Sequence, residues 1–272
     1  MSVSRPRALS PSRASDFKQC PLLYRLRAID KLPEPPSQAQ VKGTLVHAVL
    51  DQLYEVDARR RTVEEALTML EPQWSQLRQK HQEEYADLFA SSTEESLWLK
   101  SARGLVESYF GMEDPSRLEP ASRESFVGAT LADGTRLRGV LDRADIAPAG
   151  QVRLVDYKTG KAPPQAYQDK ALFQMKFYAL VWWRTHEVVP TLLRLMYLQD
   201  QQVLDYSPTA EELEKFERTV QALWAAMQEA MDTGDFQPRT SKLCGWCAHQ
   251  KLCPEFGGTP PAYPLPLPLA GT

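Results

Sequence analysis

Apolar residues in the first 110 positions recur with the spacing of amphipathic helices. Between Val41 and Ala58 they return about every 3.6 residues and form one stripe. The stripe is made of Leu45, Val46, Val49, Leu50, Leu53 and Tyr54. The same spacing predicts helices over residues 15–28, with Ser15 as N-cap, and over 63–82 and 93–111. We therefore expect a helical lobe over residues 41–115.

The pattern changes after residue 120, where apolar and polar residues alternate as they do in strands. We predict strands over residues 123–131, 135–146, 151–157, 192–198 and 202–206. Turn residues at Asp133-Gly134 and at Pro148-Ala149-Gly150 separate the first three of them. Helical spacing returns over 167–185 and 209–232. The pattern thus predicts a helical N-terminal part followed by an α/β part.

Composition is that of an ordinary globular protein, with 43% hydrophobic and 25% charged residues over 272 positions. The formal net charge of −3 gives no overall basic field for nucleic acid. Near the N-terminus cations outnumber acids: Arg5, Arg7, Arg13, Lys18, Arg25, Arg27 and Lys31 against Asp16 and Asp30. The chain lacks both a run of about 18 apolar residues and the apolar stretch of a secretory signal. We expect a cytoplasmic protein with no membrane span.

The segment LVDYK at residues 154–158 carries two charged residues in an otherwise apolar strand. If it forms a hairpin with residues 138–146, position 149 is the midpoint and Asp142 lies opposite Asp156. Opposed residues of an antiparallel pair have Cβ atoms about 4.5–5.5 Å apart. Alternation then gathers Asp142, Asp156 and Lys158 at one end of an apolar face. Asp145 falls on the other face, where we expect it to be solvated.

Two opposed carboxylates repel each other, and a divalent cation held between them removes the conflict. Oxygen ligands suit Mg²⁺ or Mn²⁺. The alternative for Asp156 and Lys158 is a pair of edge charges that face water. The apolar surroundings of Asp142 favour the metal site.

His47, Gln174 and Tyr178 are ordinary residues when each is taken alone. His47 follows Gly43 by four residues on the predicted helix, and a lone helical histidine is more commonly a packed or surface residue than a ligand. Gln174 and Tyr178 are four residues apart and therefore share one face of their helix.

The cysteines form a second candidate site, made of Cys20, Cys244, Cys247 and Cys253. A C-x2-C pair in a reducing compartment favours a metal over a disulfide. Pro21 and Pro254 each follow a cysteine, as a proline follows the last cysteine of a ferredoxin run. Spacing alone supports a zinc site with four cysteine ligands at least as well as an iron–sulfur cluster. A redox C-x2-C beside two core cysteines is the remaining alternative.

Taken in order, these residues resemble one family. G-x-x-x-H at Gly43 and His47, G-x-x-D ending at Asp142, D-x-K at Asp156 and Lys158, and Q-x-x-x-Y at Gln174 and Tyr178 are similar to the motifs of RecB-type PD-(D/E)XK nucleases. The resemblance implies one nuclease domain over residues 15–256. Its restriction-endonuclease-like core, a mixed β-sheet flanked by helices, would span 120–235. Residues 1–14 are expected to be flexible, and the Pro-rich tail at 257–272 to be disordered.

The resemblance also implies a role for each residue. The ligands of one or two Mg²⁺ or Mn²⁺ ions would be His47, Asp142, Asp156 and the backbone carbonyl of Tyr157, with Glu124 as a further candidate. Lys158 would be the catalytic lysine, and Gln174 and Tyr178 would hold the DNA. Metal-activated water would hydrolyse the phosphodiester bond by in-line displacement, without a covalent intermediate.

A single N-terminal cysteine with a C-terminal C-x2-C-x5-C resembles the iron–sulfur subgroup of these nucleases. That subgroup includes the AddB-type helicase–nuclease subunit and the nucleases of CRISPR adaptation. The resemblance implies that Cys20, Cys244, Cys247 and Cys253 hold a [4Fe–4S] cluster, with residues 240–256 closing onto Cys20. Because a clip across so long a loop stabilises most in theory, we expect a structural role.

The resemblance further implies an exonuclease that acts on single-stranded DNA in repair or recombination. Aromatic residues that either stack bases or pack in the core are Tyr24, Tyr157, Tyr167, Phe173 and Tyr178. The chain has no G-x-x-x-x-G-K-[ST] phosphate loop, so unwinding would need a helicase or repair-complex partner. The alternatives are a CRISPR adaptation nuclease that trims spacer precursors, a nuclease acting on RNA, and a non-catalytic scaffold that holds a metal on its four cysteines and binds DNA.

Overall fold

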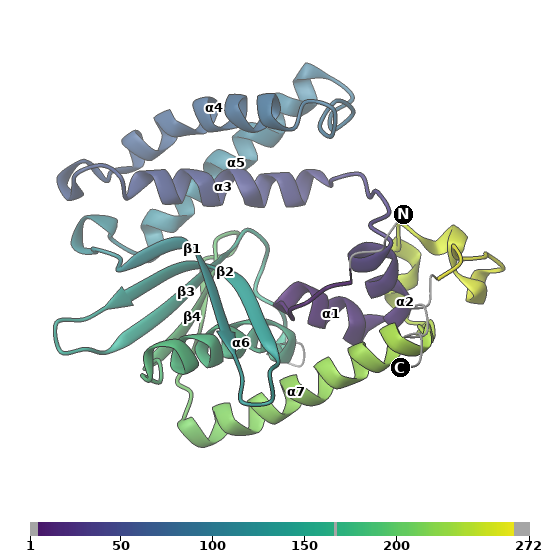
Figure 1. Ribbon diagram of the computed structural model, residues 1–272. Coiled ribbons are helices and arrows are strands. Elements are labelled where there is room, and N and C mark those ends of the chain that lie inside the picture. The colour runs from purple at the N-terminus through teal and green to yellow at the C-terminus, as the bar shows by residue number, and fades with distance from the viewer. Residues whose placement is uncertain (1–4, 166–167, 264–272) are drawn as a thin grey trace. The chain divides into compact units, whose positions relative to one another are not determined.

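The computed structural model describes residues 5–165 and 168–263 (Figure 1). The described chain divides into two compact units. The first draws on Met1–Glu34, Gly128–Gly139 and Glu211–Thr272, and the second on Pro35–Val127 and Val140–Ala210. A single domain over residues 15–256 stays a prediction. Among the described helices, none combines the length and the apolar character that crossing a bilayer requires.

A mixed sheet runs through the second unit, as expected. Its strands, in spatial order, are β1 (Ser122–Thr130), β2 (Arg136–Ile146), β3 (Val152–Lys158), β4 (Leu192–Tyr197) and β5 (Gln202–Tyr206). β2 and β3 pair antiparallel, β3 and β4 parallel, and β4 and β5 antiparallel. A parallel pair needs a crossover connection, and α6 (Gln168–His186) supplies it.

The helices of the N-terminal lobe are α3 (Gln38–Leu53), α4 (Val63–Lys80) and α5 (Ser92–Met112). Each begins after a hydroxyl side chain that accepts a backbone N–H three residues on, and these caps are Ser37, Thr62 and Ser91. Short 3₁₀ turns at Ala58–Arg60 and Pro115–Arg117 flank α4 and α5.

One hydrophobic core joins this lobe to the sheet. The apolar stripe of α3 packs with α4 and α5 against the face of the sheet that carries Val155, Tyr157 and Met196. Figure 1 shows α3, α4 and α5 side by side. The other face of β3 meets α6, where Gln174 contacts Asp156. Adjacent residues of β3 therefore point to differently covered faces, and Asp156 and Tyr157 are both buried.

The first unit holds α1 (Pro11–Gln19), α2 (Pro21–Tyr24) with a π-helical turn at Arg25–Ile29, and α7 (Ala210–Thr233), whose first residue belongs to the second unit. It ends in 3₁₀ turns at Lys242–Trp246, Gln250–Leu252 and Pro254–Phe256. In Figure 1 these turns are yellow and lie beside α2. Tyr263 in the tail donates to the Met231 carbonyl at 2.9 Å, and the disorder expected for residues 257–272 stays a prediction. Residues 264–272 lie outside the described residues.

The N-terminal segment differs most from the prediction. The helix expected over residues 15–28 with Ser15 as N-cap instead begins at Pro11 after Ser10 and breaks at Cys20. Cys20 is extended, with φ −163° and ψ 116°, because a residue before proline avoids the helical region. The flexibility expected for residues 1–14 stays a prediction; Leu9 forms a bridge with Leu137 and α1 begins at Pro11. The Leu9 amide donates to the Arg136 carbonyl at 2.8 Å, and the Leu9 carbonyl accepts from the Arg138 amide at 2.9 Å.

Candidate metal centres

His47 lies on α3 and reaches the sheet at β3. Its Nε2 lies 2.9 Å from the backbone oxygen of Tyr157, which can only accept a hydrogen bond, so Nε2 carries a proton. Its ring meets the Tyr157 ring edge-on, with centroids 5.9 Å apart. Nδ1 is thereby turned toward Glu124 Oε1 at 3.3 Å and Asp142 Oδ2 at 3.5 Å. The predicted neighbourhood of His47, Asp142 and the Tyr157 carbonyl is therefore present.

The register of the β2–β3 hairpin positions Asp142. Arg143 pairs with Val155, as predicted, so Asp142 is next in line opposite Asp156. Asp142 Oδ2 accepts the backbone N–H of Tyr157 at 2.8 Å. One strand pair thus fixes both the carboxylate of Asp142 and the carbonyl of Tyr157.

Glu124 completes the group from β1. Its φ of +39° lies in a region that residues other than glycine rarely adopt. Such strain costs on the order of 1–3 kcal/mol and clusters at functional sites. One ligand atom each from His47, Glu124 and Asp142 lies within 4.8 Å of the others. Asp156 does not belong to this set.

Electrostatics at this centre favour an added cation. Burial and the nearby charge of Asp156 raise the pKa of Asp142 to about 7, against the opposing influence of His47 and the Tyr157 N–H. Burial alone would lower the pKa of His47, but the carboxylates of Glu124, Asp142 and Asp156 outweigh it and raise that pKa to about 9. The carboxylates are therefore short of nearby positive charge, which a bound divalent ion would supply.

Asp156 belongs to an adjacent triad with Lys158 and Gln174. Its Oδ2 lies 2.7 Å from Lys158 Nζ, and its Oδ1 accepts from Gln174 Nε2 at 2.8 Å. Lys158 Nζ also donates to Gln174 Oε1 at 2.9 Å, which closes the triad. The Tyr178 hydroxyl bonds to Gln174, and burial raises the pKa of Tyr178 to about 12. The buried Asp156 thus orients an ammonium group that is 31% exposed.

The donor set suits an oxygen-preferring divalent ion. It consists of one imidazole, the carboxylates of Glu124 and Asp142, the Tyr157 carbonyl and the neighbouring Asp156, a set typical of Mg²⁺ or Mn²⁺ sites. An open cavity of about 480 Å³ adjoins it, lined by Gly43, Thr44, His47, Ala48, Asp51 and Glu124. A Cβ at Gly43 would come no closer than 3.5 Å to Thr159, so space alone does not require glycine there.

Asp51 is a residue at this cavity that the sequence analysis missed. It lies one helical turn after His47 and forms an ion pair of 2.9 Å with Arg123. Burial raises its pKa, against the opposing charge of Arg123. Its position four residues after His47, and so on the same helix face, is the sequence feature that could have identified it.

Behind the metal centre, Arg143 forms a buried network that the sequence pattern did not predict. It is 1% exposed and makes a bidentate pair with Glu113, at 2.7 and 2.9 Å. It also donates to the Tyr157 hydroxyl at 2.6 Å. The expectation that Asp145 is solvated was wrong: it lies 3.1 Å from Arg143 and 2.8 Å from Arg153, because the helical lobe covers that face of the sheet.

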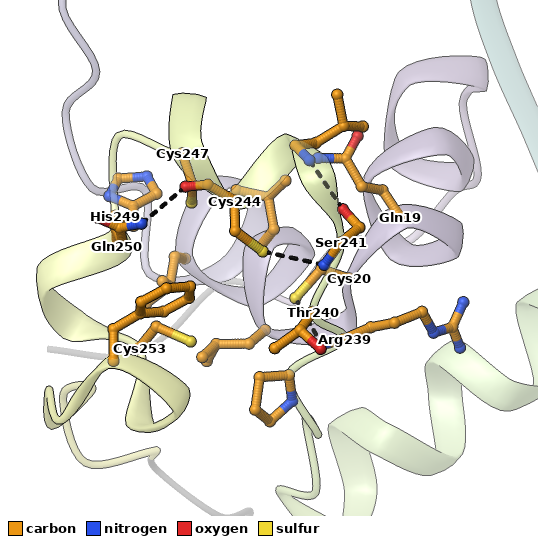
Figure 2. A pocket seen from close by; sticks show the side chains of 16 residues that line it. Gln19, Cys20, Arg239, Thr240, Ser241, Cys244, Cys247, His249, Gln250 and Cys253 are labelled. Atoms are coloured by element: carbon orange, nitrogen blue, oxygen red, sulfur yellow. Dashed lines mark hydrogen bonds between the residues drawn. The ribbon is translucent and has the colours of Figure 1, made fainter.

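The four cysteines line one pocket in the first unit (Figure 2). They come from the α1–α2 break and from the C-terminal turns, so both ends of the chain contribute to it. Backbone N–H groups approach two of the sulfurs: Arg239 lies 3.4 Å from Cys20 Sγ, and Ser241 lies 3.3 Å from Cys244 Sγ. Burial raises the pKa of the Cys247 thiol, and charges on Cys20 and Cys244 would raise it further. The predicted convergence of the four residues is present.

Ion pairs hold the segments that carry these cysteines. Arg27 bonds Asp16 at 2.7 Å and Glu34 at 2.7 and 2.9 Å. The buried His249 in turn places Nε2 2.7 Å from Glu34 Oε1. Gly258 lies so close to the preceding turn that a Cβ there would fall 2.2 Å from the Lys251 carbonyl oxygen, so this position requires glycine.

Comparisons with known proteins bear on the family and the fold. A model of the PD-(D/E)XK nuclease superfamily matches residues 8–254. The Gene 69 protein of Mycobacterium phage L5 is 23% identical over 286 aligned positions, covering 91% of this chain and 96% of that protein. The Gene 69 protein of Mycobacterium phage D29 is 25% identical over 279, with coverages of 91% and 96%. A presumed exonuclease from Eubacterium rectale has a similar fold, with a TM-score of 0.60, 12% identity and coverages of 89% and 88%.

Proposed function

The chain belongs to the PD-(D/E)XK nuclease superfamily, and from this premise we propose that it is a divalent-metal-dependent DNA exonuclease that acts on single strands. One observation carries the proposal: His47, Glu124 and Asp142 converge beside the triad of Asp156, Lys158 and Gln174. A scaffold that only binds DNA would need neither a cluster of carboxylates nor an oriented ammonium group.

In the proposed mechanism, His47, Glu124, Asp142, Asp156 and the Tyr157 carbonyl would hold one or two Mg²⁺ or Mn²⁺ ions. A bound ion supplies Lewis acidity and a water of lowered pKa. Asp142 is kept in place by the Tyr157 N–H, and His47 by the Tyr157 carbonyl. Both ligands are thus oriented by the backbone of one strand, which limits the reorganisation that the reaction requires.

Lys158 is the proposed catalytic lysine. Asp156 and Gln174 hold its ammonium group at 2.7 and 2.9 Å. From there Nζ can donate to an oxygen of the reacting phosphate and stabilise the charge that develops on it. Gln174 and Tyr178 hold this arrangement from α6 and, we propose, contact the DNA strand.

The exonuclease assignment draws support from the fold shared with the presumed exonuclease and from the motif order. We propose a role in DNA repair or recombination in the cytoplasm, with a helicase or repair-complex partner to provide the single strand. Of the aromatic residues considered for base stacking, Tyr24, Tyr157 and Tyr178 are buried, which favours core packing. Tyr167 lies outside the described residues.

We also propose that the cysteines hold a [4Fe–4S] cluster as in the iron–sulfur subgroup. All four cysteines line one pocket, which supports a metal group held on four sulfurs. The cluster would join residues that lie more than 220 positions apart.

The proposed activity is tested with end-labelled single- and double-stranded DNA and RNA and anaerobically purified protein, in Mg²⁺, Mn²⁺ or EDTA. The expected result is a ladder from one end of the DNA single strand that disappears in EDTA. Cleavage confined to RNA or to duplex interiors would contradict the proposed substrate. DNA binding without cleavage would favour the scaffold.

The cluster is tested on the same preparation by iron, sulfide and zinc analysis and by thermal unfolding before and after oxidation. We expect iron and sulfide near four atoms each per chain and a lower melting temperature after oxidation. A colourless, zinc-containing protein would contradict the cluster, and an unchanged melting temperature would contradict its structural role.

A further inference from the structure

A group of arginines in the first unit has no role in either metal centre. We call Arg7, Arg136 and Arg138 the arginine surface. Arg136 and Arg138 are exposed on β2, on either side of the buried Leu137. Alternation along the strand therefore places both side chains on the same face. Arg7 is exposed on the N-terminal segment.

The backbone brings these residues together. Leu9 forms a parallel bridge with Leu137, and its amide and carbonyl bond to Arg136 and Arg138. The N-terminal segment, rich in arginine, is thus fixed beside a strand that is also rich in arginine. The sequence alone shows that arginines are frequent near the N-terminus. It does not show that this segment lies beside the arginines of β2.

The structure separates arginines that are engaged from those that are available. Arg5 pairs with Asp232 at 2.7 Å and donates to the Met231 carbonyl at 2.6 Å. Arg13 donates to the Ala8 carbonyl at 2.8 Å. Arg25 and Arg27 pair with Asp30, Asp16 and Glu34. Among the described residues, the arginine surface has no ion pair.

A cavity of about 430 Å³ opens at this place. Its lining includes Arg5, Arg7, Arg136, Trp224, Gln228 and Asp232. Asp232, the acidic residue of the lining, is already paired with Arg5. The nearby Asp133 is occupied by the amide and hydroxyl of Thr135, both at 3.0 Å. The cavity thus presents unneutralised guanidinium groups together with an amide and an indole.

Guanidinium groups that approach one another repel, and a bound anion removes this repulsion. Burial and the charge of Arg138 lower the pKa of Arg13, which indicates like charges close together. An arginine fork matches the geometry of phosphate oxygens and binds them with paired hydrogen bonds. A chain of phosphodiesters supplies such groups at regular intervals.

We propose that the arginine surface binds the phosphodiester backbone of the nucleic-acid substrate, at phosphates other than the one that reacts. The inference rests on the proposed nuclease function and adds a second contact region for the same substrate. Phosphate contacts carry no base information, so the surface is expected to serve every sequence equally.

The test compares the full chain with the triple variant Arg7→Gln/Arg136→Gln/Arg138→Gln. Binding of a fluorescein-labelled oligothymidylate is followed by anisotropy in EDTA, which prevents cleavage, between about 50 and 200 mM salt. The control, Arg59→Gln/Arg103→Gln/Arg117→Gln, removes the same charge from exposed positions in the second unit.

The slope of log K against log salt is negative, and each lost phosphate contact makes it less steep by about 0.7 for a single strand. The slope of the triple variant should therefore be less steep by about 2. At about 0.1 M salt its affinity should fall by roughly tenfold to a hundredfold, and the control should change much less. Equal losses in both variants would overturn the proposal. So would competition by polyglutamate as strong as that by DNA, since the surface would then bind any polyanion.

A small substrate separates this proposal from the proposed function. Hydrolysis of bis(p-nitrophenyl) phosphate with Mn²⁺ needs no extended backbone, so the triple variant should match the wild type. A protein that hydrolyses this compound but whose triple variant still binds DNA normally would overturn the arginine surface alone. Loss of DNA binding in the triple variant of a protein without any hydrolytic activity would overturn the nuclease and support the surface.

Discussion

The two candidate metal centres are built in contrasting ways. His47, Asp142 and Asp156 lie on a long helix and on paired strands, whose hydrogen bonds fix where each side chain points. The cysteines lie on a helix break and on short 3₁₀ turns, held by ion pairs among Arg27, Glu34 and His249. Regular elements position the first centre. In the second centre, the positions of the cysteines depend on the contacts that join the two ends of the chain.

Because of this difference, we expect the first centre to serve catalysis and the second to serve stability. Reacting groups must be held within a fraction of an ångström, which a strand pair with a buried core behind it achieves without a metal. A site made of turns has little regular structure of its own, so the proposed cluster would contribute to folding there. Changes at the first centre should therefore affect the rate, and changes at the second the stability.

The largest effect that distinguishes the centres is expected from Lys158→Ala. Loss of one preorganised charge at the reacting group should lower the cleavage rate by roughly 10²–10³-fold. The affinity for Mn²⁺, measured by calorimetry, should change less than the rate, since Asp156 is the proposed ligand that Lys158 contacts, while His47, Glu124 and Asp142 form a set of their own. Lys161→Ala, at an exposed position just beyond β3, is the control. An unchanged rate, or a loss of Mn²⁺ binding that accounts for the whole effect, would show that Lys158 is not catalytic.

The network behind the first centre should govern its resistance to acid. Burial alone would raise the pKa of Glu113, but Arg143 and Arg153 hold it below its usual 4.5. A lowered folded pKa stabilises the protein above pH 4.5, and this contribution is lost as pH falls through the folded value. Glu113→Gln removes the bidentate partner of the buried Arg143 and leaves it the pair with Asp145, which should cost roughly 3–5 kcal/mol in the free energy of unfolding.

Urea unfolding from pH 3 to pH 7 measures this effect. Near neutral pH, the free energy of unfolding should be lower for Glu113→Gln than for the wild type. It should also fall less steeply as the pH is lowered toward 3. Glu107→Gln, which removes an exposed partner of Arg103, serves as the control. Parallel curves for wild type and Glu113→Gln would contradict the assignment of acid sensitivity to this carboxyl group.

Cys244→Ser tests the second centre. If the cysteines hold a cluster, its loss should lower stability by roughly 2–4 kcal/mol, the range for a cross-link that closes a long loop. Cleavage per folded molecule should be retained at temperatures well below the new melting point. A rate that collapses while the variant is fully folded would mean that the two centres are not separable.

A smaller effect is expected from Glu34→Gln, which weakens the links of Glu34 to Arg27 and His249. The loss in the free energy of unfolding should be about 1 kcal/mol, the upper end for ion pairs near the surface. If the cysteines hold the proposed cluster, the iron content of Glu34→Gln after aerobic storage should fall faster than that of Glu255→Gln, an exposed control on the last turn. Identical iron retention in the two variants would show that the ion pairs do not support the cysteine segment.

The sequence predicted the parts that follow from periodicity. The β2–β3 register came from one turn and a count of positions, and it correctly placed Asp142 opposite Asp156. The stripe of α3 correctly predicted its buried residues. The family resemblance added His47 and Glu124, which no local pattern distinguishes from ordinary helix and strand residues.

What the sequence could not provide depends on which element covers which face. Asp145 was read as solvated because alternation identifies the two faces of a strand but not the helices above them. The break at Cys20 was missed, although Pro21 indicates it, because the apolar spacing continues across it. The set of ligand atoms within 4.8 Å includes Glu124 and not Asp156, whose oxygens bond Lys158 and Gln174.

The most direct measurement is DNA cleavage by Asp156→Ala beside Asp205→Ala, with folding checked by circular dichroism. Asp205 lies on β5 of the same sheet, where it pairs with Arg194 at 2.7 Å, and it belongs to neither centre. We predict that Asp156→Ala folds and has lost metal-dependent cleavage, because Lys158 has lost its anchor and the site a carboxylate, while Asp205→Ala cleaves as the wild type does. A folded Asp156→Ala variant that cleaves at the wild-type rate would contradict the proposed site.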